Sequence, residues 1–230
     1  MELLVECPPT YPLGAKIVFV GEAPGADEVT AREGFVGAAG RCLQRACQVA
    51  GIDWATAGRT NISKRRPPDN KFREAFYELH KEPIYTKTGK LSKKTSKSLL
   101  WTQEMNEWVD RLHQELREAD PNLIVALGNE ALSALTGLEG ITNYRGSVLS
   151  SVSWLRRADD TPMKVLAALH PSYIIRGQHL EFWPLVYDLK KARREMEFRE
   201  IRREPINSFI EPSLEDILER LNIIASWPKT

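Results

Sequence analysis

Long apolar runs and paired cysteines are both absent from this 230-residue chain. No apolar stretch approaches the roughly 18–20 residues that a membrane-spanning helix needs. The start of the chain also lacks the basic residues and apolar core of a secretion signal. The three cysteines form no Cys-x-x-Cys pair and leave one unmatched, which argues against a disulfide framework. We therefore expect a protein of the reducing cytoplasm, with no membrane partner.

A large net charge is absent too, because the formal charge is only +1. The charge is nevertheless unevenly placed. Six basic residues between Arg59 and Arg73 are balanced by Asp69 alone, and six lysines between Lys81 and Lys97 by Glu82 alone. Such local basic stretches suit a polyanion. A solvated loop is an equal alternative for the second stretch, whereas the first adjoins other candidate site residues.

Short apolar runs that end in Gly or Pro are typical of buried strands in a parallel sheet. Three are clear (residues 17–20, 123–127 and 165–169), and Thr60–Ser63 is predicted as a further short strand and its exit. Helical periodicity separates them. The pattern predicts an α/β fold, a three-layer α/β/α sandwich around a mainly parallel four-stranded sheet.

Helices are predicted at residues 38–50, from Trp101 to Leu116, and from Phe182 to about Arg203. A capping pattern at Ser213 opens a last helix. Residues 146–154 are a hairpin or an edge region. We expect a domain over residues 1–204, with a polar, partly mobile basic insertion at about 67–99, and a C-terminal helical extension over 205–230.

Two strand ends carry the residues with the clearest chemistry. Glu22 follows the first apolar run and His170 follows the last. In a parallel sheet, the loops at the carboxyl ends of the strands form the ligand site. The chain therefore brings a carboxylate and an imidazole, far apart in sequence, to one rim.

Four motifs in order make a resemblance specific. They are Gly-Glu-Ala-Pro-Gly at 21–25, Phe-Val-Gly-x-x-Gly at 35–40, Thr60-Asn61 with Lys-Arg-Arg-Pro-Pro at 64–68, and His-Pro-Ser at 170–172. From Lys16 to Arg176 the chain resembles the uracil-DNA glycosylase superfamily, nearest its family-four type. The resemblance implies a monomeric DNA glycosylase that flips out a pyrimidine, hydrolyses its N-glycosidic bond and leaves an abasic site.

The resemblance also implies roles for the catalytic residues. Glu22 would lie near the anomeric carbon and orient or activate the attacking water. His170 would donate to the pyrimidine O2 as negative charge develops there. Glu28 would close the pocket near the pyrimidine C5, although an exposed acid at a helix start is an equal alternative.

The same resemblance assigns the base-binding and DNA-binding residues. Phe35 would stack on the base and Asn61 would read its amide edge, beside Ala23 and Gly25. Ile174 would fill the gap left by the extruded base, unless it packs in the core. The residues expected to contact phosphates are Lys64, Arg65, Arg66, Ser172 and Arg176.

One departure from the family concerns its iron–sulfur cluster, which four cysteines hold. Arg65 stands where one of these cysteines is expected, Cys7 has no close partner, and no cysteine follows Cys47. We therefore expect no cluster, no metal and no other cofactor. The region that a cluster would brace needs another support, and the insertion containing Lys87–Lys97 is a candidate.

Other functions remain open at this point. The missing cluster and the unusual insertion leave a glycosylase for a 5-modified pyrimidine as an alternative, since a remodelled rim could admit a larger base. Such bases include the hydroxymethylated or glucosylated bases of viral DNA, and the enzyme would act in anti-viral defence. A non-catalytic DNA-binding module of replication machinery is a second class. A nucleotide-binding Rossmann enzyme is disfavoured, because the Gly-x-Gly-x-x-Gly spacing is absent. One branch of the superfamily becomes covalently attached to uracil-containing DNA through a histidine-bearing loop. Self-crosslinking of this kind is disfavoured as well, because Pro67-Pro68 stands in place of that loop.

Overall fold

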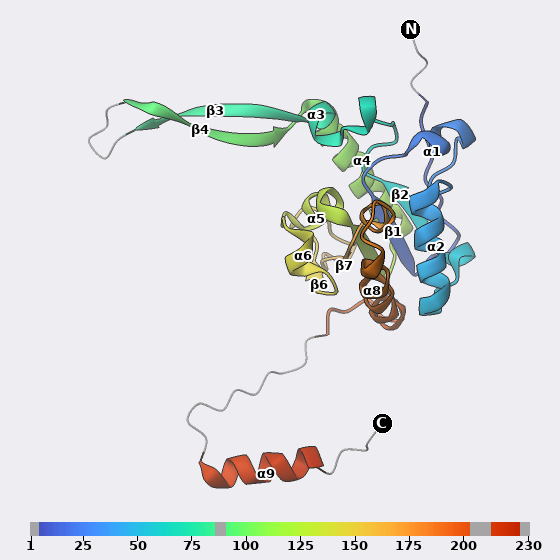
Figure 1. Ribbon diagram of the computed structural model, residues 1–230, viewed down its shortest axis with the longest axis vertical. Helices are drawn as coiled ribbons and strands as arrows, with labels where there is room; N and C mark the ends of the chain where they lie inside the picture. Colours follow the sequence, from blue (N-terminus) through green and yellow to red (C-terminus); the bar gives the residue numbers. More distant parts are fainter. Residues whose placement is uncertain (1–4, 86–90, 203–212, 226–230) are drawn as a thin grey trace.

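The computed structural model describes residues 5–85, 91–202 and 213–225, and its centre is a five-stranded sheet (Figure 1). The strand order is β2-β1-β5-β7-β6. The strands are β1 (Ile17–Gly21), β2 (Gly58–Asn61), β5 (Leu123–Leu127), β6 (Val148–Ser150) and β7 (Lys164–Ala168). The α/β class and mainly parallel sheet are confirmed, but four strands was one too few. The added strand is β6, which pairs antiparallel with β7 at the edge.

The parallel register aligns the carboxyl ends of four strands. Gly21 of β1 pairs with Asn61 of β2, and Leu127 of β5 pairs with Ala168 of β7. Every residue of β1, β5 and β7 is buried, as expected for strands covered on both faces. The loops that follow β1, β2, β5 and β7 therefore leave the sheet at one edge.

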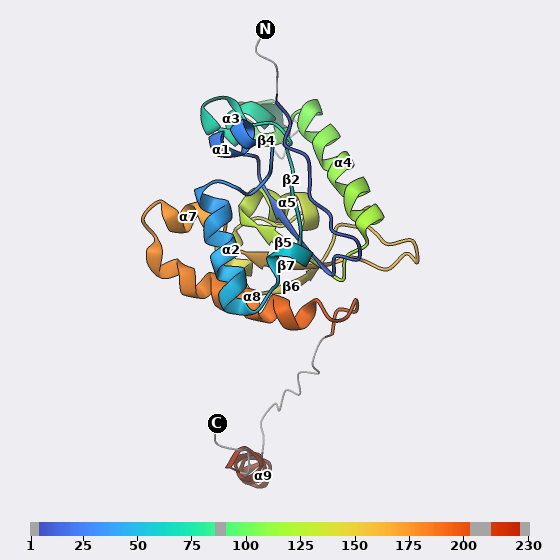
Figure 2. The same ribbon diagram turned by 90° about the vertical axis from the view of Figure 1, so that its right-hand side faces the viewer.

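Helices cover both faces of the sheet and complete the three layers (Figure 2). Alternate residues of each strand belong to two separate apolar cores, with Val18 and Val20 in one and Ile17 and Phe19 in the other. The first core packs against α4 (Gln103–Ala119) and α5 (Gly128–Thr136), and the second packs against α2 (Ala38–Ala50) and α8 (Phe182–Glu195).

The polar insertion has regular structure, which its composition did not predict. Strands β3 (Tyr77–Tyr85) and β4 (Leu91–Trp101) form a two-stranded antiparallel ribbon that extends away from the domain (Figure 1). Composition did not indicate these strands, because cross-strand pairing stabilises a polar ribbon that has no amphipathic pattern.

Short elements connect the layers, and two helix boundaries differ from prediction. Trp101 ends β4, and Thr102 caps α4 by accepting a bond from the Met105 amide. Helix α8 ends at Glu195 rather than near Arg203. The last helix, α9 (Leu214–Ala225), has the predicted capping pattern. The remaining elements are α1 (Ala26–Ala31), η1 (Trp54–Thr56), η2 (Pro68–Asn70), α3 (Phe72–Phe76), α6 (Ile141–Tyr144), α7 (Pro171–Ile175) and η3 (His179–Glu181). Within the described residues, no helix is long and apolar enough to cross a membrane.

Candidate active site

A cavity of about 420 Å³ lies where the loops after β1, β2 and β7 meet. Glu22 and His170, which are 148 positions apart in the sequence, both line it. Most of the residues predicted for the site line the same cavity, and three do not. Those that line it are Glu22, Ala23, Gly25, Glu28, Phe35, Asn61, Arg66, His170, Ser172 and Arg176.

Glu22 is the first residue after β1, and its carboxylate is half-buried. Burial, followed by the negative charge of Glu130, raises the pKa of Glu22 to about 7, although Arg176 and Arg73 act in the opposite direction. Among the described residues no hydrogen-bond donor satisfies the carboxylate. A half-buried carboxylate with no hydrogen-bond donor and a pKa near neutral is suited to acid–base work on a ligand.

Glu130, which the sequence did not single out, sets part of this electrostatic environment. It is buried near the start of α5, where its carboxylate accepts bonds from Arg73 Nε at 2.7 Å and from the hydroxyl of Tyr77. Both partners come from the chain around α3 and the start of β3. The contact therefore ties the root of the ribbon to α5 and to the charge that acts on Glu22.

His170 has a defined protonation state and tautomer. Its Nδ1 accepts a hydrogen bond from the backbone amide of Ser172 at 3.1 Å. Burial, and secondarily Arg176, lowers the pKa of His170 to about 4, so the ring is neutral at physiological pH. Because Nδ1 is an acceptor, the single proton of the neutral ring is on Nε2. Nε2 can therefore donate to a ligand in the cavity.

Gly128 makes room for His170. Its φ of +87° lies in the left-handed region, and an added Cβ would lie 3.0 Å from the Cβ of His170. A side chain at this position would be strained and would also crowd the imidazole.

Phe35 and Asn61 approach each other over Gly21. A Cβ at Gly21 would lie 2.3 Å from Asn61 Oδ1 and 3.2 Å from Phe35 Cζ. Phe35 has a φ of +64°. The carbonyl of Phe35 packs so closely against Gly40 of α2 that a side chain at position 40 would clash with it. Such a backbone conformation is costly for a non-glycine residue and is found mostly at functional positions. An aromatic face and a side-chain amide thus border one part of the cavity.

Glu28 joins the two glycine-rich loops. Its carboxylate accepts bonds from the amides of Gly25 at 3.0 Å and Gly37 at 2.7 Å. Glu28 is buried, so the alternative of an exposed acid at a helix start is wrong. Two charge-assisted bonds hold both walls of the cavity in place.

The predicted phosphate contacts divide into two groups. Arg66, Ser172 and Arg176 line the cavity, whereas Lys64 and Arg65 do not. Lys64 is a correction: it is 3 % exposed and its Nζ lies 3.0 Å from a carboxylate oxygen of Glu115, so it cannot reach DNA. A charge that is buried must be paired, and α4 supplies the partner.

Ile174 is a second correction. It is 3 % exposed and packs in the apolar core beneath α7, so it cannot insert into DNA. The next residue, Ile175, is 41 % exposed and lines the cavity. His170 caps α7, and the helical spacing from Pro171 to Ile174 turns the latter inward.

The comparison with family models decides the identity of this fold. Residues 8–193 match the model of the uracil DNA glycosylase superfamily. The chain belongs to this superfamily.

Three relatives are all named type-4 uracil-DNA glycosylase. The protein of Archaeoglobus fulgidus is 30 % identical over 166 residues, covering 70 % of this chain and 67 % of the relative. The protein of Thermotoga maritima is 30 % identical over 184 residues, covering 79 % and 78 %. The protein of Pyrobaculum aerophilum is 26 % identical over 160 residues, covering 70 % and 68 %.

An iron–sulfur cluster of the family-four kind does not fit this member of the superfamily. The thiol of Cys7 donates to the carbonyl of Glu28 at 3.3 Å. The segment that contains Arg65 lies alongside, because Glu6 and Arg65 form an antiparallel bridge. Cys42 and Cys47 are both in α2, and burial raises the pKa of Cys47 to about 12. Thiolates are the cluster ligands, and no four cysteines converge here. Among the described residues, no other cluster of His, Cys, Asp or Glu could hold a metal ion.

Helix α4 supports the segment that a cluster would brace. Besides the pair of Lys64 with Glu115, Arg65 pairs with Glu104 and lies over the ring of Trp108, 5.4 Å from its centroid. Arg111 donates to the carbonyl of Ile62 at 2.7 Å. The side chains of Lys87–Lys97, expected to brace this segment, lie outside the described residues.

Proposed function

We propose that this protein is a monofunctional DNA glycosylase that hydrolyses the N-glycosidic bond of uracil in DNA and leaves an abasic site. The observation that carries the proposal is the meeting of Glu22 and His170 in one cavity, beside an aromatic ring and a side-chain amide. The names of the relatives support uracil as the base and DNA as the partner.

The reaction develops two opposite charges. As the bond between the anomeric carbon and N1 breaks, its electron pair leaves with the base, and the sugar becomes oxocarbenium-like. The Nε2–H of neutral His170 stabilises the charge that gathers on the pyrimidine O2. The proton can remain on His170, because a hydrogen bond alone stabilises the anionic leaving group.

Glu22 acts on the sugar side. Its ionised carboxylate stabilises the positive sugar and orients a water molecule toward the anomeric carbon. The water oxygen forms the new bond, and the carboxylate accepts the proton that the water loses. Burial makes this charge more effective than it would be in bulk water.

Base selection falls to the opposite wall. Phe35 stacks on the extruded base, and the Asn61 amide pairs with the imide edge of uracil, which presents both an acceptor and a donor. Arg66, Ser172 and Arg176 hold the phosphates around the extruded nucleotide. Ile175 replaces Ile174 as the side chain proposed to fill the vacated stack.

Base release measured by mass spectrometry tests the proposal. Duplexes would carry uracil, 5-hydroxymethylcytosine or glucosylated 5-hydroxymethylcytosine at one position. We expect free uracil from the parent protein, and a loss of about 100-fold or more in single-turnover rate with Glu22→Gln or His170→Ala. Duplex affinity should change less than about threefold, because neither residue contacts phosphate.

The alternatives predict different outcomes of this experiment. Release of a modified cytosine but not uracil would replace the proposed substrate with a viral-type base. Binding that survives both substitutions, with no base released from any duplex, would identify a non-catalytic DNA-binding module. Asp27→Asn provides a matched control, because Asp27 also lines the cavity but is exposed.

A further inference from the structure

The β3–β4 ribbon presents an exposed surface beyond its root. At its root, Tyr77 and Trp101 pack partly against the apolar core. Beyond the root, the paired residues Leu79 and Leu99 are 53 % and 54 % exposed. The ribbon then extends away from the domain (Figure 1).

The chemistry of the ribbon is that of a phosphate-binding surface. Every residue of β4 from Ser92 to Ser98 is Ser, Thr or Lys. Hydroxyl and ammonium groups are the side-chain donors that contact DNA phosphates without reading sequence. Lys81 and Lys97 also occupy directly paired positions of the two strands. Like charges at such positions oppose pairing, and a bound polyanion would remove this repulsion.

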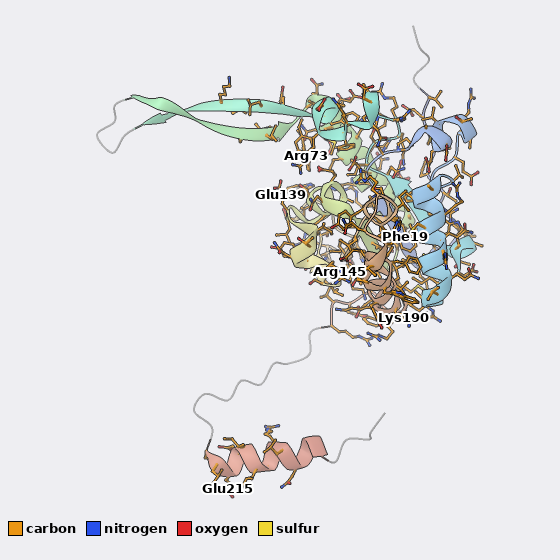
Figure 3. The ribbon with its side chains drawn as sticks, in the orientation of Figure 1. Phe19, Arg73, Glu139, Arg145, Lys190 and Glu215 are labelled. Carbon is orange, nitrogen blue, oxygen red and sulfur yellow. The ribbon has the colours of Figure 1, made fainter. Side chains whose placement is uncertain are left out.

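The position of the ribbon connects it to the candidate active site. Asn70 lines the cavity only a few residues before the ribbon begins. Arg73 and Tyr77 then bind Glu130 behind Glu22. In Figure 3, Arg73 lies where the ribbon joins the domain. The ribbon thus starts at the rim through which a nucleotide would enter.

The dimensions of the ribbon match duplex DNA. The nine residues of β3 extend about 30 Å at the usual rise per residue. One helical turn of B-DNA is about 34 Å long, and its major groove accepts a two-stranded ribbon. An arm of this length that starts at the rim reaches about one turn of duplex beside the extruded nucleotide.

We propose that the β3–β4 ribbon is a second DNA-binding element, which contacts the phosphates of the duplex about one helical turn to one side of the extruded nucleotide. This inference rests on the proposed function for the identity of the polyanion. The ribbon binds duplex without sequence preference and holds the enzyme on DNA while the cavity samples nucleotides.

Charge removal tests the ribbon. The variant K93Q/K94Q/K97Q removes three positive charges from β4, and K190Q/R194Q/R202Q removes three exposed charges elsewhere. Lys190 lies at the far end of the domain from the ribbon (Figure 3). Binding to 10-bp and 30-bp duplexes without a target base would be measured over a range of salt concentrations. Circular dichroism would verify the fold of each variant.

The two charge-removal variants should differ in how they bind the 30-bp duplex. On the 30-bp duplex, we expect the ribbon variant to bind about tenfold more weakly, with a log–log salt slope shallower by about 2–3. The 10-bp duplex, too short to span both cavity and ribbon, should bind both variants alike. The control should keep the parent's dependence on duplex length.

A shortened ribbon gives an independent readout. Glu78 and Leu100 are directly paired, so Asn-Gly can replace residues 79–99 as a two-residue hairpin turn. We expect this variant to lose the gain in affinity between 10-bp and 30-bp duplexes. Parent-like binding by the ribbon variants on both duplexes would overturn the ribbon proposal. Absence of base release by the parent would instead overturn the proposed function, whatever the ribbon binds.

Discussion

Glu22 is the residue whose environment most directly sets the chemistry. Its pKa is raised to about 7 by burial and by Glu130, whereas the pKa of His170 is lowered to about 4. If the ionised carboxylate is the active form, base release rises with pH through about 7. His170 stays neutral throughout this range and adds no second inflection. One ascending limb is therefore expected between pH 5 and 9.

Glu130→Gln should move that limb to lower pH. Removing the Glu130 charge leaves Glu22 with less repulsion and leaves Arg73 without its carboxylate partner. Both changes favour ionised Glu22, so its pKa falls. Single-turnover base release from pH 5 to 9 measures the midpoint. Glu139→Gln is the control, because Glu139 is an exposed acid in the same part of the fold (Figure 3). An unchanged or higher midpoint in Glu130→Gln would contradict the assignment.

The same raised pKa means that ionised Glu22 destabilises the folded state. A folded-state pKa of about 7, above the ordinary 4.5, means that folding favours the protonated form. The contribution of protonated Glu22 to the free energy of unfolding is complete below about pH 4.5 and is lost as pH rises through 7. Glu22→Gln, which cannot ionise, should therefore unfold at a higher temperature than the parent at pH 8. The two proteins should unfold at similar temperatures at pH 4.5.

The size of that effect can be bounded. The shift corresponds to on the order of 2 kcal/mol after allowance for partial solvent exposure. For a chain of this length, each kcal/mol changes the unfolding temperature by about 2–4 °C. Thermal unfolding at the two pH values measures the difference. A parent that is as stable as Glu22→Gln at pH 8 would show that the carboxylate is better solvated than its surroundings indicate.

At the scale of elements, packing against α4 gives the basic residues of the loop after β2 two different roles. Lys64 is buried against Glu115 and the hydroxyl of Thr60, whereas Arg66 is exposed at the cavity rim. Lys64→Met should destabilise the fold by about 1–3 kcal/mol, because it removes the buried cation that pairs with the partly buried carboxylate of Glu115. Denaturant unfolding measures this loss. DNA binding by the folded fraction should keep its salt dependence.

Arg66→Ala should do the reverse. Its free energy of unfolding should stay within about 0.5 kcal/mol of the parent value. The log–log salt slope of DNA binding should become shallower by about 1, as expected when one phosphate contact is lost. Each variant serves as the other's control. If Lys64→Met instead weakened DNA binding without loss of stability, the buried position of Lys64 would be wrong.

These elements also show how far a sequence predicts such a site. Glu22 and His170 were predictable because each follows a short apolar strand, and parallel strands align their carboxyl ends. Asn61, the last residue of the polar strand β2, was predictable only from the family motif. Glu130 was not predictable, because its role depends on the packing of α5 against a ribbon root more than 50 residues earlier. Helical phase alone could not decide between Ile174 and Ile175, because they lie three and four residues after Pro171 and both spacings fall on one side of a helix.

Two features of the structure could not be predicted from local sequence, namely the strands of the ribbon and the burial of Lys64. Strand pairing in β3 and β4 depends on contacts between strands, so a polar stretch without periodicity gave no signal for it. Lys64 belongs to a run that is exposed only at Arg66, and burial of its neighbours depends on α4 crossing above them. Local sequence carries the chemistry of a side chain but not the elements that cover it.

At the scale of the whole molecule, the contacts of Lys164 join the residues around the end of α8 to the sheet. Lys164 in β7 is fully buried, and its ammonium donates to the backbone carbonyls of Glu195 and Phe198 at 2.8 and 2.7 Å and pairs with the Glu195 carboxylate. The chain just after α8 therefore satisfies a buried charge. By contrast, Leu214, Ile217, Leu218 and Leu221 of α9 are all exposed and join neither apolar core.

Two truncations should therefore behave differently. A chain of residues 1–202 keeps every partner of Lys164 and both cores, so we expect an unfolding temperature within about 2 °C of the full chain and an unchanged rate of base release. A chain of residues 1–194 leaves the Lys164 ammonium buried without its partners, which costs several kcal/mol. Thermal unfolding and single-turnover assays of both chains measure the contrast. Marked destabilisation of the 1–202 chain would mean that the C-terminal segment is part of the folded domain.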